Sequence, residues 1–317
     1  MGRYVLRRIA SAVVTLWVLA TIIFLMVNVL PGNVGRQVLG PFASEDDVVR
    51  FNHSIGTDRA LISQYLTSIR RVFTLDFGNS YQSGAPVKDV IVPALFRSGK
   101  LALLAFVITI PISIATGIFA ARRKDKAADR VVVNSSLAAS SIPDFVTAAV
   151  LMSVFCVTFK LGHVFADPPP GTSVLGQLPY LLTPAVALAI AYFGYIARMS
   201  RAGVINGLQS DYARTATMKG LSKGRVMRKH ILRNSLAPTI TVISVQVGYL
   251  FGGIIGVEKV FNYHGLGSTI FSASTSHDIP VLQGAVLLVA IVYMISTLLA
   301  DVLIAFLNPR IRLETAR

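Results

Sequence analysis

The stretch LALLAFVITIPISIATGIFAARRKDKAADR, residues 101–130, combines the two features that decide the fold of this chain. Its first part, Leu101–Ala121, carries no charge and is long enough to cross a bilayer as a helix, which needs about 20 mostly apolar residues. The remaining part holds five Lys or Arg side chains. Because basic residues collect in the short cytoplasmic loops of membrane proteins, this boundary indicates a spanning helix that ends at the cytoplasmic face.

The composition of the whole chain also indicates a membrane protein. Of its 317 residues, 53% are hydrophobic and only 14% are charged, whereas soluble domains average about 25% charged residues. The net charge of +15 would suit a nucleic-acid binder, but the apolar residues form runs that no water-exposed surface would carry. The composition excludes a soluble enzyme and a disordered chain, and the single cysteine excludes a disulfide framework.

Six apolar runs predict spanning helices, so we expect an all-α integral membrane protein with six transmembrane helices. The runs are Ile9–Leu30, Leu101–Ala121, Val131–Phe159, Pro179–Ala197, Pro238–Val257 and Pro280–Leu307. We interpret the first run as a retained helix and not as a signal peptide. It is longer than the roughly 7–15 apolar residues of such a peptide, and no small-residue cleavage site follows it.

The charge of the loops predicts on which side the termini lie. The N-terminal tail, residues 122–130, residues 198–237 and the C-terminal tail together hold 20 of the 30 basic residues. The alternate short loops, 160–178 and 258–279, hold one each. The loop 31–100 is not informative, because long loops translocate largely regardless of charge. Both termini are therefore predicted to be cytoplasmic.

The long segment 31–100 has a helical pattern of its own. Apolar residues recur at helical spacing from Leu61 to Phe73, with polar residues off that face. The simpler interpretation is an amphipathic helix that covers the outer end of the helix bundle. The alternative is a docking surface for an external partner.

The predicted cytoplasmic segment 198–237 has the pattern of two short helices separated by a glycine. Asp211 suits a helix N-cap, about two turns can follow, and Gly220 suits the position after the helix end. Ser222 can cap a second, basic helix, Lys223–Leu236. A basic loop alone is usually an orientation signal, but this pattern predicts a rigid projection into the cytoplasm.

No catalytic or nucleotide-binding motif occurs in the chain. The phosphate loop G-x-x-x-x-G-K-[ST], H-E-x-x-H, G-x-S-x-G and the dinucleotide pattern G-x-G-x-x-G are all absent. The five histidines lie far apart in sequence, so no metal-ligand cluster is indicated. We expect no enzymatic activity and no cofactor or metal on this chain. Active transport would take its energy from an ion gradient or from another subunit.

Polar groups inside the predicted spans are candidates for a substrate path, because such groups are costly in lipid. Asp144 lies in the middle of a predicted span, with Asn134 and Ser141 before it near one helical face, and Gln246 lies on the fifth span. The functional hypothesis is a substrate path or gate at these residues. The alternative hypothesis is that Asp144 makes a structural polar contact.

The fifth predicted span also carries small residues at helical spacing. Gly248, Gly252 and Gly256 lie on one face, which predicts close packing of helices. The spans contain only two aspartates, Asp144 and Asp301, and these make a weak proton relay. Paired broken helices, which are typical of many secondary transporters, are not evident either. These features count against a gradient-driven carrier that works alone.

Short motifs in a fixed order run along nearly the whole chain. They are Tyr4–Arg8, Leu30–Gly32, Gly56–Ala60, Gln64–Leu66, Asp76–Tyr81, Asp211–Leu221, His230–Asn234, Pro238, Glu258, Phe261, Gly265–Gly267 and Asn308–Arg312. With these motifs the chain resembles the first membrane-spanning permease subunit of an ATP-binding-cassette (ABC) importer of the dipeptide/oligopeptide/nickel group. One such motif would be weak evidence, but their order and spacing together are highly specific.

The resemblance implies a type I ABC importer fold and a role for the segment 198–237. In such permeases this loop carries the coupling helix, which sits in a groove of the ATPase subunit. The small Ala216 is expected to let the helix lie close in that groove. Arg214 stands where the wider class has glutamate, and the peptide group commonly has Arg-Thr-Ala at this place. The coupling residues implied are Asp211, Arg214, Thr215, Ala216, Lys219, Gly220 and Leu221.

Some residues depart from the pattern of this family. Asn33 and Asn308 stand where Asp is frequent, and His264 stands where Pro is frequent. Asp144 stands where a neutral residue is common, which would suit a cationic or amine-bearing substrate.

The resemblance also implies a domain plan and a set of partners. The first helix and an external scaffold would occupy 1–94, the transmembrane domain 95–307 and a cytoplasmic tail 308–317. The implied partners in the bacterial cytoplasmic membrane are a second permease, two ATPase subunits that bind ATP and Mg, and an external substrate-binding protein. Short peptides are the implied substrate, with nickel as the runner-up. A gradient-driven carrier and a structural scaffold subunit are the alternatives from other classes.

Overall fold

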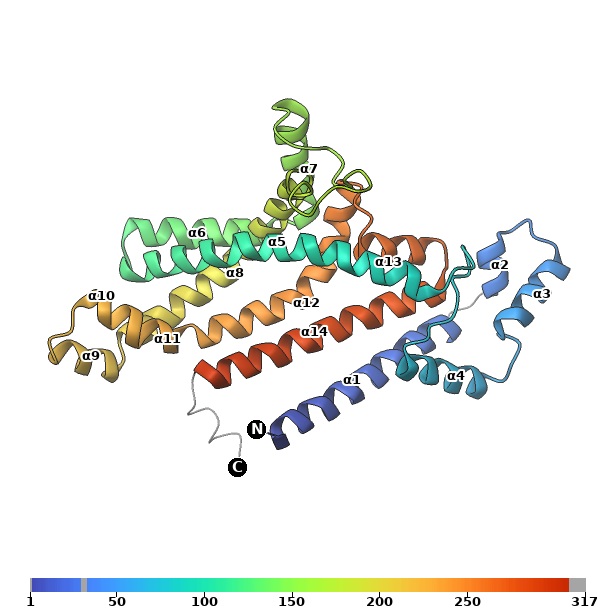
Figure 1. Cartoon of the computed structure of the whole chain (residues 1–317), viewed down its shortest axis with the longest axis horizontal. Helices are drawn as coiled ribbons and strands as arrows, with labels where there is room; N and C mark the ends of the chain where they lie inside the picture. Colours follow the sequence, from blue (N-terminus) through green and yellow to red (C-terminus); the bar gives the residue numbers. More distant parts are fainter. Residues whose placement is uncertain (1, 30–32, 308–317) are drawn as a thin grey trace. The chain divides into compact units, whose positions relative to one another are not determined.

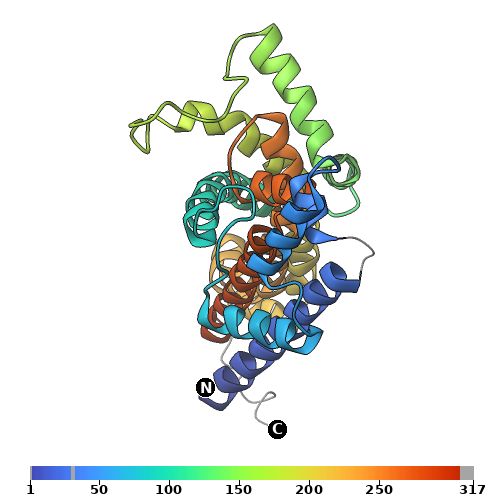
Figure 2. The ribbon, with the colours of Figure 1, turned by 90° about the vertical axis from the view of Figure 1, so that its right-hand side faces the viewer.

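A computed structural model describes residues 2–29 and 33–307 (Figures 1 and 2). These residues form helices and connecting segments, with one isolated antiparallel bridge between Asn79 and Pro86. The all-α class is therefore confirmed for the described ranges. The motifs Leu30–Gly32 and Asn308–Arg312 and the predicted tail lie outside them.

Four helices of the described chain are long and apolar enough to cross a membrane. They are α5 (Val87–Arg122), α8 (Leu178–Leu208), α12 (Ala237–Val260) and α14 (Ile279–Leu307). A bent helix pair would make a fifth span. α1 (Gly2–Val29) has a shorter apolar part, Ala10–Met26. The described residues thus contain four or five spans by this criterion, where the sequence predicts six.

The predicted span Val131–Phe159 is wrong as one continuous helix. α6 (Ala127–Ser141) ends before Pro143, and α7 (Asp144–Leu151) continues into a π-helix, Met152–Thr158. The segment Asp144–Thr158 is bent by 97° from α6. Figures 1 and 2 show α7 turning away from α6. The chain therefore bends in the middle of this apolar run.

Proline explains the position of the bend. Pro143 has no N–H to continue α6, and its ring pushes the preceding residue out of the helical region. Ile142 accordingly has extended angles, with φ −88° and ψ 127°. Asp144 is then the first residue of α7, so the prediction that it shares a helical face with Asn134 and Ser141 is wrong.

The other predicted runs are confirmed as helices, but some of their ends differ. α5 begins at Val87 and not at Leu101, and α8 continues to Leu208 and not to Ala197. The apolar run marks only the part of a helix that suits lipid. Backbone hydrogen bonding and packing can carry a helix beyond its apolar run, because the polar turns need no lipid-compatible side chains.

The chain divides into two compact units, which we describe separately. In the first unit, residues 99–263 and 293–307, α8 packs against α6, α7 and α12. Small residues let the helix backbones come close. A Cβ at Gly194 would collide with Ser136 O and with Ser140 Oγ, and a Cβ at Gly117 would lie 2.6 Å from Ala197 O. Packing between spanning helices relies on such close approach, because lipid gives them no hydrophobic drive.

The second unit, residues 2–98 and 264–292, holds four shorter helices. They are α2 (Val34–Leu39), α3 (Glu45–Ile55), α4 (Leu61–Thr74) and α13 (Leu266–Thr275). The predicted amphipathic helix is confirmed as α4, which packs against α1. Only part of its apolar face is used: Val72 is buried with Ala20, while Leu66 stays 61% exposed.

The packing of α8 gives a prediction about stability. Gly194→Ala would force α6 and α8 apart, and we expect a loss of roughly 1–3 kcal/mol, the usual cost of overpacking. Thermal unfolding of the purified chain in detergent measures this as a lower midpoint. Gly99→Ala in α5 is the control, because a Cβ there would meet nothing within 4 Å. Equal midpoints for the two variants would contradict the contact.

Candidate functional site

The segment between α8 and α12, residues 209–236, is a compact group of helices that we call the knob. It consists of α9 (Asp211–Met218), α10 (Lys223–Val226), a π-helix (Met227–Ile231) and α11 (Leu232–Ser235). Figure 1 shows it at the end of α8 from which the chain turns back into α12. The predicted pattern of two short helices is present. The second helix contains a π-helical stretch and ends at Ser235, where the sequence predicted Leu236.

The start of α9 differs from the prediction by one residue. Ser210 is the N-cap residue, in an extended conformation, and Asp211 is the first helical residue. The Ser210 hydroxyl donates to Gly207 O at 2.6 Å, which ties the cap to the end of α8. A carboxylate in the first turn still suits the positive end of the helix dipole.

The end of α9 is as predicted, with Gly220 in the left-handed region at φ +77°. The Gly220 N–H donates to Thr217 O at 3.0 Å and the Leu221 N–H donates to Ala216 O at 3.3 Å. This pair of bonds is the Schellman arrangement, which satisfies carbonyls that the helix end would leave open. The turn into α10 is thus held by backbone geometry that favours glycine.

The knob has its own apolar core, which decides how its alanines act. Ala213 and Ala216 are buried against Val226, Met227 and Ile231, together with Val204 of α8. The expectation that Ala216 faces a partner's groove is therefore corrected, because only 5% of it is exposed and it faces the knob's interior. Its small side chain lets α9 approach the rest of the knob.

The opposite face of α9 is open to a partner. Met218 is 76% exposed, a large apolar side chain at the tip of the helix. Exposed apolar side chains ringed by polar residues often mark a surface that contacts another protein. The predicted coupling residues that are exposed are Asp211, Arg214, Thr215, Lys219 and Gly220, and Leu221 is half-buried.

Two contacts tie the knob and α8 to the rest of the first unit. A Cβ at Gly203 would collide with Ser235 O, so α8 and α11 meet at their backbones. Arg201 donates to both carboxylate oxygens of Asp129, with Nε–Oδ1 2.5 Å and Nη2–Oδ2 2.6 Å. Asp129 is 3% exposed and also accepts the Asp125 N–H at 2.9 Å. The turn between α5 and α6 is thereby joined to α8 next to the knob.

Sequence reasoning missed this pair for a physical reason. Arg201 and Asp129 lie 72 residues apart, so no helical spacing links them. Arg201 was counted only as one of the charges that orient the chain. Two signals in the sequence were available for this ion pair. Arg201 comes shortly after an apolar run, and Asp129 comes just after a basic turn.

A second polar cluster lies where α7, α8 and α12 meet. Asp144 opens α7, and its Oδ1 accepts the Phe145 N–H at 2.9 Å. Tyr192 of α8 is 7% exposed and donates from its hydroxyl to Tyr249 O at 3.3 Å. A Cβ at Gly253 would collide with Asp144 Oδ2 and would lie 2.7 Å from the Tyr192 hydroxyl. Within the described residues no basic side chain forms an ion pair with Asp144.

The other residues predicted for a substrate path are placed differently. Asn134 and Ser141 are exposed on α6, while Gln246 is 4% exposed on α12. No hydrogen bond joins any of these three side chains to Asp144 in the described ranges. The structure instead brings Tyr192 to Asp144, and the sequence did not suggest Tyr192.

Two of the three predicted glycines of α12 make close contacts, and the third does not. Cβ atoms at Gly248 and Gly256 would lie 2.6 Å from Tyr293 Cδ2 and 2.7 Å from Phe145 Cβ. At Gly252 a Cβ would meet nothing within 4 Å, and the close approach falls at Gly253.

Several apolar spanning helices, a compact knob between two of them and a polar cluster at their meeting point define a membrane permease component. Family models match the chain on both sides of residue 101. One, described as binding-protein-dependent transport system inner membrane component, matches residues 113–313. The other, the N-terminal part of the same kind of membrane component, matches residues 1–101.

Full-length relatives agree with these models. A protein of Brucella abortus (strain 2308), named for a peptide transport system permease, is 34% identical, covering 99% of this chain and 100% of the relative. The glutathione transport system permease protein GsiC of Escherichia coli (strain K12) is 33% identical, covering 98% and 99%. This chain belongs to the family of inner membrane components of binding-protein-dependent transport systems. It is a multi-pass protein of the bacterial inner membrane.

Solved structures of similar fold include a membrane transporter. A crystal structure of an amino acid ABC transporter with histidines overlaps with a TM-score of 0.46 at 18% identity, covering 70% of this chain and 94% of that chain. That overlap is too low to carry an argument about individual residues.

The buried ion pair gives the second prediction. Arg201→Ala would leave Asp129 buried without its counter-charge, and breaking such a pair costs on the order of 3 kcal/mol. We expect a lower thermal midpoint, and recovery of most of it when Asp129→Ala is added, because the uncompensated charge is then gone. Arg225→Ala, an exposed residue of the knob, is the control. A double variant no more stable than Arg201→Ala would contradict the pairing.

Proposed function

We propose that this chain is one permease subunit of an ABC importer for short peptides. The observation that carries the proposal is full-length similarity to permeases named for peptide and for glutathione transport. Glutathione is itself a short peptide, so both names describe one substrate class. No observation in the structure favours nickel, a gradient-driven carrier or a scaffold role over this function.

The proposed topology has six spans with both termini in the cytoplasm. α1, the bent pair α6–α7 and the four long helices supply the spans, and the basic segments 122–130 and 198–237 would lie at the cytoplasmic face. The knob is then cytoplasmic. Its partners would be an ATPase pair that binds ATP and Mg, a second permease and an extracytoplasmic binding protein, with no cofactor on this chain.

In the proposed mechanism the exposed face of α9 contacts the ATPase. Closure of the ATPase subunits on ATP would move the knob, and the knob would move α8 through Val204 and the Gly203–Ser235 contact. α8 also carries Tyr192 at the polar cluster. The same helix would thus transmit the motion of the knob to the point where α7 and α12 meet. ATP drives transport only if its contacts favour one bundle state over the other.

Coupling through α9 is tested by Met218→Glu. A charge in a contact that buries this side chain should abolish ATP-dependent peptide uptake by the assembled transporter in proteoliposomes, without changing its thermal midpoint. Val174→Glu is the matched control, because Val174 is an equally exposed apolar residue, at 71%, in a segment predicted to be external. Normal uptake by Met218→Glu in a folded transporter would contradict coupling through α9.

A substrate role for Asp144 is tested by Asp144→Asn. If the carboxylate contacts the amine of the passing peptide, the variant should take up a peptide with a free N-terminus roughly tenfold more slowly. Loss of one charge-assisted hydrogen bond has about this effect. Uptake of the same peptide with an acetylated N-terminus should be unchanged. A structural contact alone predicts equal losses for both peptides, and equal losses would reject the substrate role.

A further inference from the structure

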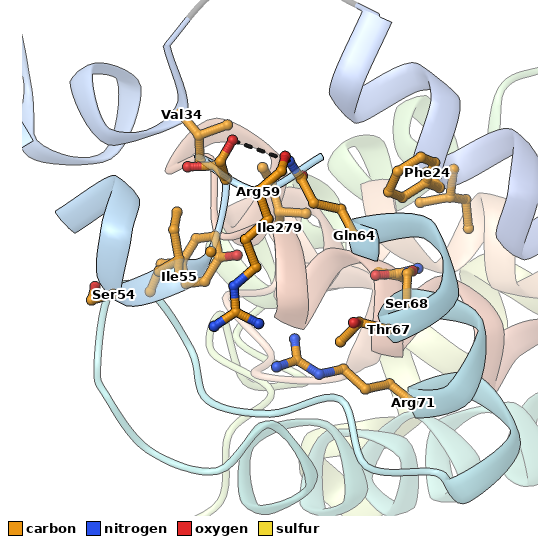
Figure 3. A pocket seen from close by; sticks show the side chains of 15 residues that line it. Phe24, Val34, Ser54, Ile55, Arg59, Gln64, Thr67, Ser68, Arg71 and Ile279 are labelled. Carbon is orange, nitrogen blue, oxygen red and sulfur yellow. Dashed lines mark hydrogen bonds between the residues drawn. The ribbon is translucent and has the colours of Figure 1, made fainter. Parts of the chain in front are cut away.

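A cavity of about 180 Å³ lies in the second unit (Figure 3), and its lining includes no residue of the knob or of the Asp144 cluster. α1 supplies Ile23 and Phe24, and the first turns of α14 supply Ile279 and Gln283. α4 supplies a polar wall that includes Thr67 and Ser68. Gln283 Nε2 donates to Ser68 Oγ at 2.9 Å, which joins two of these walls.

Among the described residues that line this cavity, two arginines are the only charged ones. Arg59 follows the turn after α3, and Arg71 lies on α4. Figure 3 shows their guanidinium groups pointing toward one another across the cavity. Neither guanidinium makes an ion pair or a hydrogen bond with the described residues. Two like charges that line one cavity repel each other unless a counter-charge lies between them.

The backbone leaves room for both guanidinium groups. Gly56, with φ +76°, lies under Arg59, since a Cβ there would be 3.3 Å from Nε. Gly78, with φ +74°, lies under Arg71, since a Cβ there would be 3.6 Å from Cζ. Both arginines thus rest on backbone that favours glycine, so their convergence is built into the local fold.

The carboxylates next to the cavity are occupied by other groups. Asp278 accepts the Ser80 hydroxyl at 2.5 Å and the Tyr81 N–H at 3.0 Å. Asp76 accepts the Gly78 N–H at 3.2 Å. Asp58 faces His53 at 3.9 Å. The chain therefore supplies positive charge at the cavity and uses its nearby negative charge elsewhere.

A phenol donor and the level of the cavity narrow the class of ligand. Tyr81 lines the cavity, and burial raises the pKa of its phenol, so its hydroxyl stays protonated as a donor. Ile23 and Phe24 lie near the end of the apolar part of α1, and Ile279 begins the span of α14. The ends of apolar segments lie at the level of lipid headgroups.

We propose that this cavity binds a phosphate-type oxyanion, supplied by the headgroup of an anionic phospholipid or by free phosphate. Arginine forks match phosphate oxygens with paired hydrogen bonds, and charge-assisted bonds of this kind are the strong ones. The bound oxyanion would offset the repulsion between Arg59 and Arg71. It would also hold α4 and the turn after α3 against the ends of α1 and α14.

The test uses the complete transporter and two probes, phosphatidylglycerol and inorganic phosphate. Native mass spectrometry measures the phosphatidylglycerol that the wild type retains in mixed phosphatidylcholine/phosphatidylglycerol nanodiscs. The cavity variant is Arg59→Gln with Arg71→Gln, and it should retain at least roughly tenfold less. The control, Arg50→Gln with Arg70→Gln, removes the same charge from exposed positions that do not line the cavity and should retain as much as the wild type.

The second arm measures thermal stabilisation by inorganic phosphate in lipid-free detergent. Specific loss of phosphatidylglycerol in the cavity variant supports the proposal with the headgroup as the source. Phosphate that stabilises the wild type and the control but not the cavity variant, with lipid retention unchanged, supports it with free phosphate as the source. If neither probe distinguishes the cavity variant from the control, the proposal is overturned. The midpoint without ligand shows that each variant is folded.

Discussion

The close approach of α8 to its neighbours is the constraint on which the first unit depends. Spanning helices gain little from hydrophobic burial inside lipid, so packing contacts have to hold them together. α8 meets α6 at Gly194 and α11 at Gly203. In both cases a backbone carbonyl of the neighbouring helix lies against the glycine. Side-chain hydroxyls add to this, since Thr109 of α5 donates to Ala189 O of α8 at 2.6 Å. One helix thereby connects the knob with the polar cluster at Tyr192.

Hydropathy and helix-end patterns were enough to predict much of this fold. Apolar runs located the long helices, and Gly220 marked the end of α9 because few other residues adopt its angles cheaply. The break at Pro143 was missed because an apolar average over the run Val131–Phe159 stays high across a single proline. Helix ends beyond the apolar runs, as at Val87, were missed because polar helical turns outside the lipid carry no hydropathy signal.

The contacts between distant residues could not be predicted from one sequence. Asp129 with Arg201 and Asp144 with Tyr192 bring separate elements together, and Arg59 and Arg71 line one cavity from separate elements. No periodicity links such residues, because their proximity results from how the helices pack. Ala216 is another residue whose neighbours could not be predicted from one sequence. In the packed knob its small side chain lies against Met227 and Ile231.

In the proposed mechanism, motion of the knob would reach the polar cluster at Asp144 along α8, which contacts the knob at Val204. From Tyr192 to Val204 a helix rises about 18 Å, so a tilt of α8 at the knob moves its far part as one body. The break at Pro143 leaves α7 free of the helical hydrogen bonds that would tie it to α6. α7 is joined to α8 and α12 around Gly253, whereas α6 is joined to α8 at Gly194 and through the Asp129–Arg201 ion pair. In the proposed mechanism a movement of α8 would therefore act on α6 and α7 at separate points, and the break at Pro143 would let the two helices respond differently.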